Sequence, residues 1–111
     1  MAEQDLGAVI TRLANTIAAR KGAAPAESYT ASLLAGGPAK CAKKLGEEAV
    51  ELVLAATGES DERVAAEAAD VIYHLLVLLT SRGVEASAVA AALATREGTS
   101  GHAEKARRPG K

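Results

Sequence analysis

Acidic residues are concentrated in two short segments that otherwise consist mainly of alanine, valine and leucine. Residues 44–51 read KLGEEAVE, and residues 67–70 read EAAD. The five acids in these segments are Glu47, Glu48, Glu51, Glu67 and Asp70. Carboxylates three or four residues apart share one face of a helix and repel each other by about 0.2–0.5 kcal/mol per pair in water, and by more when they are desolvated. A bound cation is the expected compensation.

Ligand sets made only of oxygen atoms are typical of hard divalent cations. Mg²⁺ is usually held by one or two carboxylates together with water and substrate phosphates. The sequence therefore predicts a magnesium site whose ion accepts a polyphosphate, because carboxylates without a metal would repel such a substrate. Lys44 and Lys40 fall on the same helical stripe as the acids of the first segment, where an ammonium group can reach a phosphate.

Two other interpretations of the acids remain open. The first is a solvated acidic stripe on an amphipathic helix, which suits Glu67 and Asp70 less well because their neighbours are alanines. The second is a di-iron carboxylate bundle, which uses Glu-x-x-His on two helices. Neither Glu48 nor Glu67 has a histidine three residues later. His74, one turn beyond Asp70, is interpreted as an interior histidine rather than a ligand.

The elements that must position these acids are helices. Apolar residues recur at spacings of three and four throughout the chain, and no segment alternates with a period of two. Ser28 and Ser60 are predicted N-caps, and Pro38 lies near the first turn of a helix, where its missing N–H costs nothing. The predicted helices cover residues 3–19, 29–35, 38–57, 61–82 and 85–96.

The two long helices carry the acids, and the short connection at Gly58 and Glu59 makes them antiparallel neighbours. Glu51 and Glu67 then lie at comparable heights, within about two helical turns. Residues 71–79 read VIYHLLVLL and are apolar on every side, so complete burial of this helix is expected to need a second subunit. The predicted fold is an all-α antiparallel helical bundle that is completed by homodimerisation.

Composition limits the remaining possibilities. A chain of 111 residues with two tyrosines as its only aromatic residues forms one domain, with a core of leucine, valine, isoleucine and alanine. We assign residues 1–97 to this domain and residues 98–111 to a basic tail that is expected to be flexible when taken alone. The net charge of −1 favours neither nucleic acid nor an anionic membrane as a partner.

A cytoplasmic location is expected. Cys41 is the only cysteine, so no disulfide framework exists, and its small side chain is expected to be buried. The first residues lack the basic region of a signal peptide. The longest uncharged run, residues 71–81, is shorter than the 20 or so residues that span a bilayer.

The same segments resemble a known family, the phosphoribosyl-ATP pyrophosphatases. This family belongs to a wider group of all-α nucleoside triphosphate pyrophosphatases that includes the MazG type, whose signature is Glu-x-x-Glu followed by Glu-x-x-Asp. The resemblance extends over nearly the whole chain. Its segments are residues 28–30 (SYT), 43–51 (KKLGEEAVE), 67–79 (EAADVIYHLLVLL) and 98–108 (GTSGHAEKARR). Family members often carry serine at the position of Arg107, a departure that removes no expected metal ligand.

The resemblance implies a specific reaction. Its members hydrolyse 1-(5-phosphoribosyl)-ATP to 1-(5-phosphoribosyl)-AMP and pyrophosphate with Mg²⁺, the second step of histidine biosynthesis, and related enzymes pair helices from two subunits. The implied metal ligands are Glu48, Glu51, Glu67 and Asp70. Glu47 is implied as a further ligand or as a base for the attacking water. The residues expected to contact substrate are Lys44, Lys40, Arg20, Ser28 and Tyr29.

Several of these roles have alternatives. Lys21 is a further candidate for a phosphate contact, and Ser28 has its capping role as an alternative to substrate binding. The basic residues of the tail, Lys105, Arg107 and Arg108, either are disordered or fold over the bound phosphates. For the whole protein, the alternatives are a house-cleaning nucleoside triphosphate pyrophosphatase and a non-catalytic helical dimerisation module.

Overall fold

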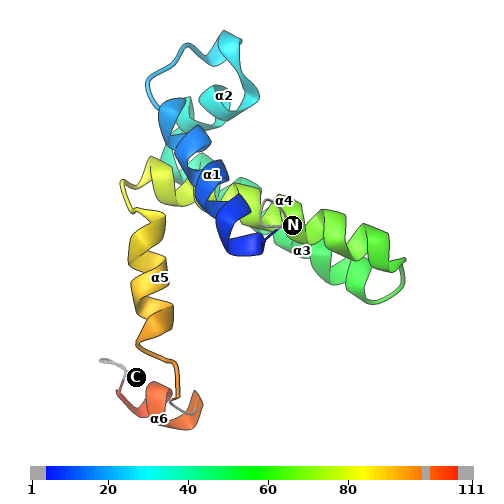
Figure 1. Ribbon diagram of the computed structural model, residues 1–111. Helices are drawn as coiled ribbons and strands as arrows, with labels where there is room; N and C mark the ends of the chain where they lie inside the picture. The colour runs from blue at the N-terminus through cyan, green and yellow to red at the C-terminus, as the bar shows by residue number, and fades with distance from the viewer. Residues whose placement is uncertain (1–4, 99–100, 108–111) are drawn as a thin grey trace.

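The computed structural model describes residues 5–98 and 101–107, and every regular element in these two ranges is helical (Figure 1). The elements are α1 (Leu6–Ala19), the 3-10 turn η2 (Pro25–Glu27), α2 (Tyr29–Ala35), α3 (Gly37–Ala56), α4 (Asp61–Ser81), α5 (Ala86–Ala94) and α6 (Gly101–Arg107). The prediction of an all-α fold is confirmed. The predicted start of the first helix at residue 3 and the tail residue Arg108, for which disorder and a phosphate contact were both left open, lie outside the described residues.

An antiparallel pair of long helices, α3 and α4, forms the frame of the molecule (Figure 1). Ser60 caps α4 by accepting a hydrogen bond from the backbone N–H of Arg63. Two acids in the first turn stabilise the helix further, because their negative charges lie at the positive end of its dipole. At the other end, the N–H of Val84 donates to the carbonyl of Leu79 over 2.8 Å. This turn needs the positive φ of Gly83, +74°, which a glycine adopts without strain.

The core lies where α1 and α2 pack against the end of the hairpin that is distant from its turn. Its most buried residues come from four helices: Ile17, Leu33, Cys41, Leu76 and Val77. The predicted burial of Cys41 is confirmed, and its thiol donates to the carbonyl of Leu33 over 3.2 Å. Lys21, just after α1, donates from Nζ to the carbonyl of Thr80 and so ties α1 to the C-terminal end of α4.

Large apolar side chains remain exposed on this single chain. Val50, Val53 and Leu54 of α3 are each more than half exposed, and so are Leu6 of α1 and Leu93 of α5. The helix α5 extends away from the α3–α4 pair (Figure 1). Within residues 71–79, Leu76 and Val77 are buried but Leu75 is not. A second subunit therefore stays a prediction, and these side chains are the surface that it would cover.

By length and composition alone, α4 could also cross a membrane. The uncharged run from which no membrane span was predicted, residues 71–81, is only part of this helix. However, α4 carries Glu67 and Asp70 in its middle, and each charge at the centre of a membrane helix costs about 2.5–3.5 kcal/mol. Length and composition do not decide between the two, because the core helix of a soluble helical bundle can have the same length and composition.

Candidate active site

Three of the five predicted acids meet between α3 and α4. Glu48 of α3 and Glu67 and Asp70 of α4 each offer one carboxylate oxygen, and these three oxygens lie within 4.8 Å of one another. Glu67 is buried, Glu48 is half-buried and Asp70 is exposed. Three converging carboxylates with one side open to solvent form a donor set that fits a hard divalent cation such as Mg²⁺. We refer to Glu48, Glu67 and Asp70 as the acid triad.

The buried member of the triad has a partner on its own helix. Arg63 lies one turn before Glu67 in α4, and its Nη2 donates to Glu67 Oε2. Its Nε donates to Glu59 Oε1 over 3.3 Å. The pKa of Arg63 is raised, first by the hydrogen bond to Glu59 and then by the charge of Glu67, with a further contribution from Glu51. Arg63 was not among the predicted site residues, although the Arg-x-x-x-Glu spacing that makes this ion pair is visible in the sequence.

The other two predicted acids lie at the edge of the triad. Glu51 is exposed and is not one of the three residues whose oxygens converge, but its charge acts on Arg63. Glu47 is exposed as well, and its Oε1 lies 3.7 Å from Nζ of Lys44. The structure therefore brings three of the five acids into one cluster and leaves the other two within its electrostatic surroundings.

Lys44 joins the triad to the start of α2. Its Nζ lies 3.5 Å from Oε2 of Glu48, four residues later on the same helix. Its pKa is raised, most strongly by the Tyr29 phenol and then by the Glu48 and Glu47 carboxylates, while burial acts in the opposite direction. Two predicted substrate contacts, Lys44 and Tyr29, thus interact electrostatically, and Lys44 lies beside the triad.

His74 lies in the interior between the two tyrosines. Its ring is packed edge to face against Tyr73, with the centroids 4.9 Å apart, and against Tyr29 at 6.5 Å. Burial lowers the pKa of His74, although the charges of Glu48 and Asp70 act to raise it. The prediction of an interior histidine is in agreement with this position, and the neutral form is the one favoured there.

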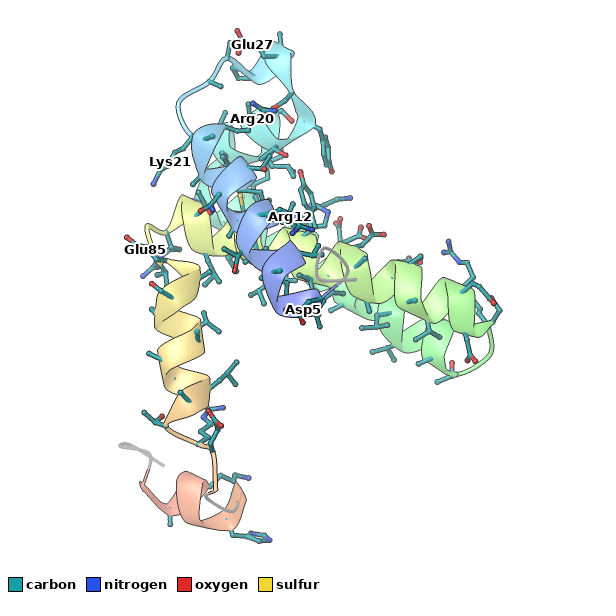
Figure 2. All side chains as sticks on the ribbon, in the orientation of Figure 1. Asp5, Arg12, Arg20, Lys21, Glu27 and Glu85 are labelled. Atoms are coloured by element: carbon teal, nitrogen blue, oxygen red, sulfur yellow. The ribbon has the colours of Figure 1, made fainter. Side chains whose placement is uncertain are left out.

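The remaining predicted substrate contacts lie outside the triad. Ser28 is the N-cap of α2 and its Oγ accepts a hydrogen bond from the N–H of Ala31 over 2.9 Å, which confirms the predicted capping role. Lys40 is exposed in the first turn of α3. Arg20 is the C-cap of α1, where Figure 2 shows it next to Lys21. Lys105 is exposed on α6.

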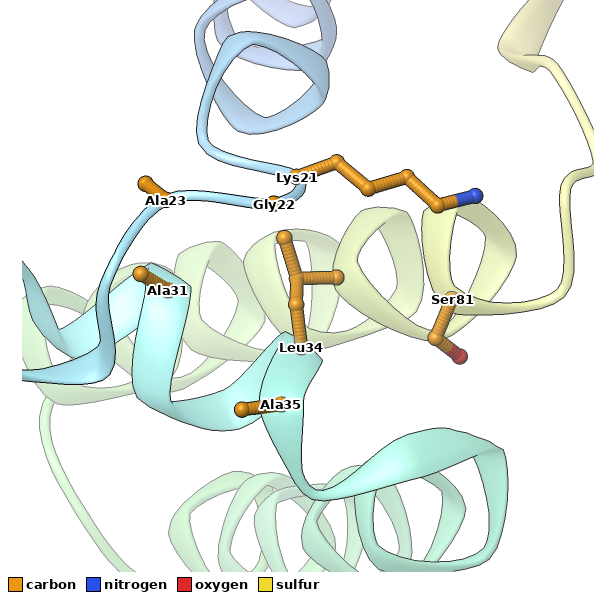
Figure 3. A pocket seen from close by; sticks show the side chains of 7 residues that line it. All are labelled: Lys21, Gly22, Ala23, Ala31, Leu34, Ala35 and Ser81. Carbon is orange, nitrogen blue, oxygen red and sulfur yellow. The ribbon is translucent and has the colours of Figure 1, made fainter.

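A small cavity lies elsewhere, near the C-terminal end of α4 (Figure 3). It measures about 140 Å³, and its lining consists of Lys21, Gly22, Ala23, Ala31, Leu34, Ala35 and Ser81. The lysine that borders it already donates to the carbonyl of Thr80, and no carboxylate lines it. The candidate site is therefore the open face of the acid triad and not this cavity.

Comparison with known proteins gives similarity over most of the chain. Residues 10–97 match a family model described as phosphoribosyl-ATP pyrophosphohydrolase. A phosphoribosyl-ATP pyrophosphatase from Cereibacter sphaeroides is 59% identical over 100 residues, which cover 90% of this chain and 97% of the relative. The protein of the same name from Caulobacter vibrioides is 57% identical over 105 residues, which cover 95% and 97%. The acid triad, Glu47, Glu51 and Lys44 all lie within the matched residues.

Proposed function

The chain belongs to the phosphoribosyl-ATP pyrophosphohydrolase family, and from this premise we propose that it hydrolyses 1-(5-phosphoribosyl)-ATP to 1-(5-phosphoribosyl)-AMP and pyrophosphate in histidine biosynthesis. The reaction is proposed to depend on Mg²⁺. The observation that carries the proposal is the convergence of three carboxylate oxygens within 4.8 Å on an open face of the helix pair. A triphosphate brings several negative charges, and such a site accepts them only when a cation is present.

The proposed metal ligands are the acid triad, with Glu51 as a fourth. Bound there, Mg²⁺ would supply positive charge to the phosphate oxygens and help to activate the attacking water. The helix pair contributes the orientation, because burial holds Glu67 on α4 while Glu48 reaches the same point from α3. Glu67 and Glu48 thus come from rigid elements, which is the arrangement that fixes a reacting group in place.

Lys44 and Glu47 are proposed to act on the substrate and on the water. The ammonium group of Lys44 lies beside Glu48 and would contact a phosphate oxygen at the edge of the site. Glu47 pairs with Lys44 and lies outside the triad, so it is better placed to accept a proton from water than to bind the ion. Tyr29, which is neighbouring and exposed, would lie against the nucleotide.

The proposal includes a homodimer in the cytoplasm. Val50, Val53 and Leu54 give α3 an exposed apolar face, and a second copy of the chain would remove this face from water. A single buried cysteine is typical of proteins that stay in a reducing compartment. Neither nucleic acid nor a membrane is a proposed partner.

Release of pyrophosphate from phosphoribosyl-ATP, measured with Mg²⁺ and again with a chelator, tests the reaction. We expect release only with Mg²⁺, and only slow release from dCTP, dUTP and ATP. Faster release from dCTP or dUTP would instead indicate a house-cleaning pyrophosphatase. Absence of release from every nucleotide at all Mg²⁺ concentrations would leave the helical dimerisation module as the better description.

A further inference from the structure

We infer that Arg63 is a built-in counter-cation of the acid triad, which competes with the divalent cation for Glu67. The inference rests on the proposed function, because it takes the triad to be a cation site. It concerns a residue outside the expected metal ligands, and it assigns to that residue an effect on how tightly the ion binds.

The first observation is that Glu67 needs a positive partner. Its side chain is only 8% exposed, and oxygens of Glu48 and Asp70 lie within 4.8 Å of its own. A carboxylate that is withdrawn from water and faces two like charges is costly unless a cation or several hydrogen bonds compensate it. Arg63 provides this compensation through the bond from Nη2 to Oε2.

The second observation is that Arg63 already has a second carboxylate partner, Glu59, outside the triad. Its Nε donates to Glu59 in the exposed turn between α3 and α4, and its side chain is 56% exposed. The charge of Glu51, the proposed fourth ligand, also acts on it. The guanidinium group can therefore shift from Glu67 toward Glu59 without disturbing the core. A divalent cation that neutralises the triad would remove the reason for Arg63 to stay on Glu67.

It follows that Arg63 stabilises the metal-free protein and weakens cation binding. The variant Arg63→Met keeps an unbranched apolar stem close to that of arginine and removes the charged guanidinium group. We expect Arg63→Met to bind Mg²⁺ about three- to tenfold more tightly than the wild type, because a like charge next to the ion is lost from a partly exposed site. Arg63→Lys should stay within about twofold of the wild type, because an ammonium at this position still reaches Glu67.

Isothermal titration of chelator-treated protein with Mg²⁺ measures this effect without substrate and without turnover. Arg82→Met is the matched control, because Arg82 is exposed at the far end of the same helix, twelve residues beyond Asp70. Its affinity for Mg²⁺ should be unchanged. Melting curves provide a second measurement. With chelator, the melting temperature of Arg63→Met should be lower than that of the wild type, and added Mg²⁺ should raise it by more than it raises that of the wild type.

The possible failures can be told apart. Equal or weaker Mg²⁺ binding by Arg63→Met, with binding by the wild type intact, would overturn the role of Arg63 and leave the proposed function standing. Absence of Mg²⁺ binding to the wild type would overturn the metal site and this inference together. If Arg63→Met is unfolded in chelator, circular dichroism should show that Mg²⁺ refolds it, and a failure to refold would contradict the competition.

Discussion

Glu48 is the residue through which α3 takes part in the acid triad, because the other two members belong to α4. We expect Glu48→Gln and Asp70→Asn each to reduce turnover of phosphoribosyl-ATP by about a hundredfold or more, since a lost ligand charge removes several kcal/mol of stabilisation from the reacting phosphates. Both changes keep the size of the side chain, so circular dichroism should show an unchanged helical fold. Pyrophosphate release measures the activity.

Glu62→Gln is the control for these two variants. Glu62 is an exposed acid in the first turn of α4 and takes no part in the triad. Its replacement removes the same charge and should leave turnover within about twofold of the wild type, because solvent and salt screen the charge of an exposed residue outside the triad. Substantial turnover by both Glu48→Gln and Asp70→Asn would refute the assignment of the triad.

His74 makes the stability of the protein depend on pH. Burial places its folded-state pKa below the usual value, so below about pH 6.5 the unfolded chain binds more protons than the folded one. The free energy of unfolding should therefore fall as the pH falls from 6.5, by at most about 1.4 kcal/mol per pH unit. Urea denaturation between pH 7.5 and 5.5, in the presence of chelator, measures this slope.

The variant His74→Gln should lose most of that slope, whereas His102→Gln should keep it. His102 is exposed on α6 and serves as the matched histidine. A slope that is the same in all three proteins would mean that another group is responsible for the pH dependence.

The acids of the site could be predicted from the sequence, whereas their detailed partners could not. Glu48, Glu67 and Asp70 follow from helical spacing and a short connection, which together determine the face that each residue shares. Glu47 and Glu51 lie on the same broad side of α3, but at 3.6 residues per turn they are rotated from Glu48 by roughly 100° and 60°. The pairing of Arg63 with both Glu59 and Glu67 depends on side-chain torsions, which spacing alone does not determine.

The short helix α2 begins at Ser28, whose hydroxyl satisfies the N–H of Ala31. Ser28→Ala should lower the free energy of unfolding by about 1 kcal/mol, because a helix N-cap is worth roughly 0.5–2 kcal/mol. Urea denaturation measures the loss, and Ser28→Thr should recover most of it. Unchanged stability in Ser28→Ala would show that the cap contributes nothing. A rise in KM that Ser28→Thr does not reverse would assign Ser28 a substrate contact as well.

The observed helix limits agree closely with those predicted, because capping residues and glycines near the helix ends determine where a helix begins and ends. The predicted helix 29–35 matches α2, and Ser60 caps α4 as predicted. The last predicted helix, residues 85–96, is longer than α5, which covers Ala86–Ala94. The 3-10 turn η2 was not predicted. The direction of α5 could not be predicted either, because few residues of the chain contact it and hydrophobic periodicity does not determine the angle between two helices.

At the scale of the whole molecule, the apolar face of α3 predicts association. Val53 is 61% exposed, with Val50 and Leu54 beside it. We expect the wild type to sediment as a dimer and Val53→Lys to shift toward the monomer, because a charge buried in an apolar interface without a partner is strongly unfavourable. Analytical ultracentrifugation measures the change over a concentration series.

Ala26→Lys is the control for this variant. It adds the same ammonium group on the exposed turn η2, away from the apolar face of α3. Its sedimentation should equal that of the wild type. A monomeric wild type, or an equally dimeric Val53→Lys, would show that α3 is not the interface.

The contacts of His74 also have an optical consequence. The chain has two tyrosines, Tyr29 and Tyr73, and no phenylalanine or tryptophan, and both tyrosine rings pack against this one imidazole. Near-ultraviolet absorption and intrinsic fluorescence therefore originate at a single place, next to the carboxylates, with no tryptophan to mask them. Occupancy of that place by ion or nucleotide can be followed spectroscopically in the unlabelled, unmodified polypeptide.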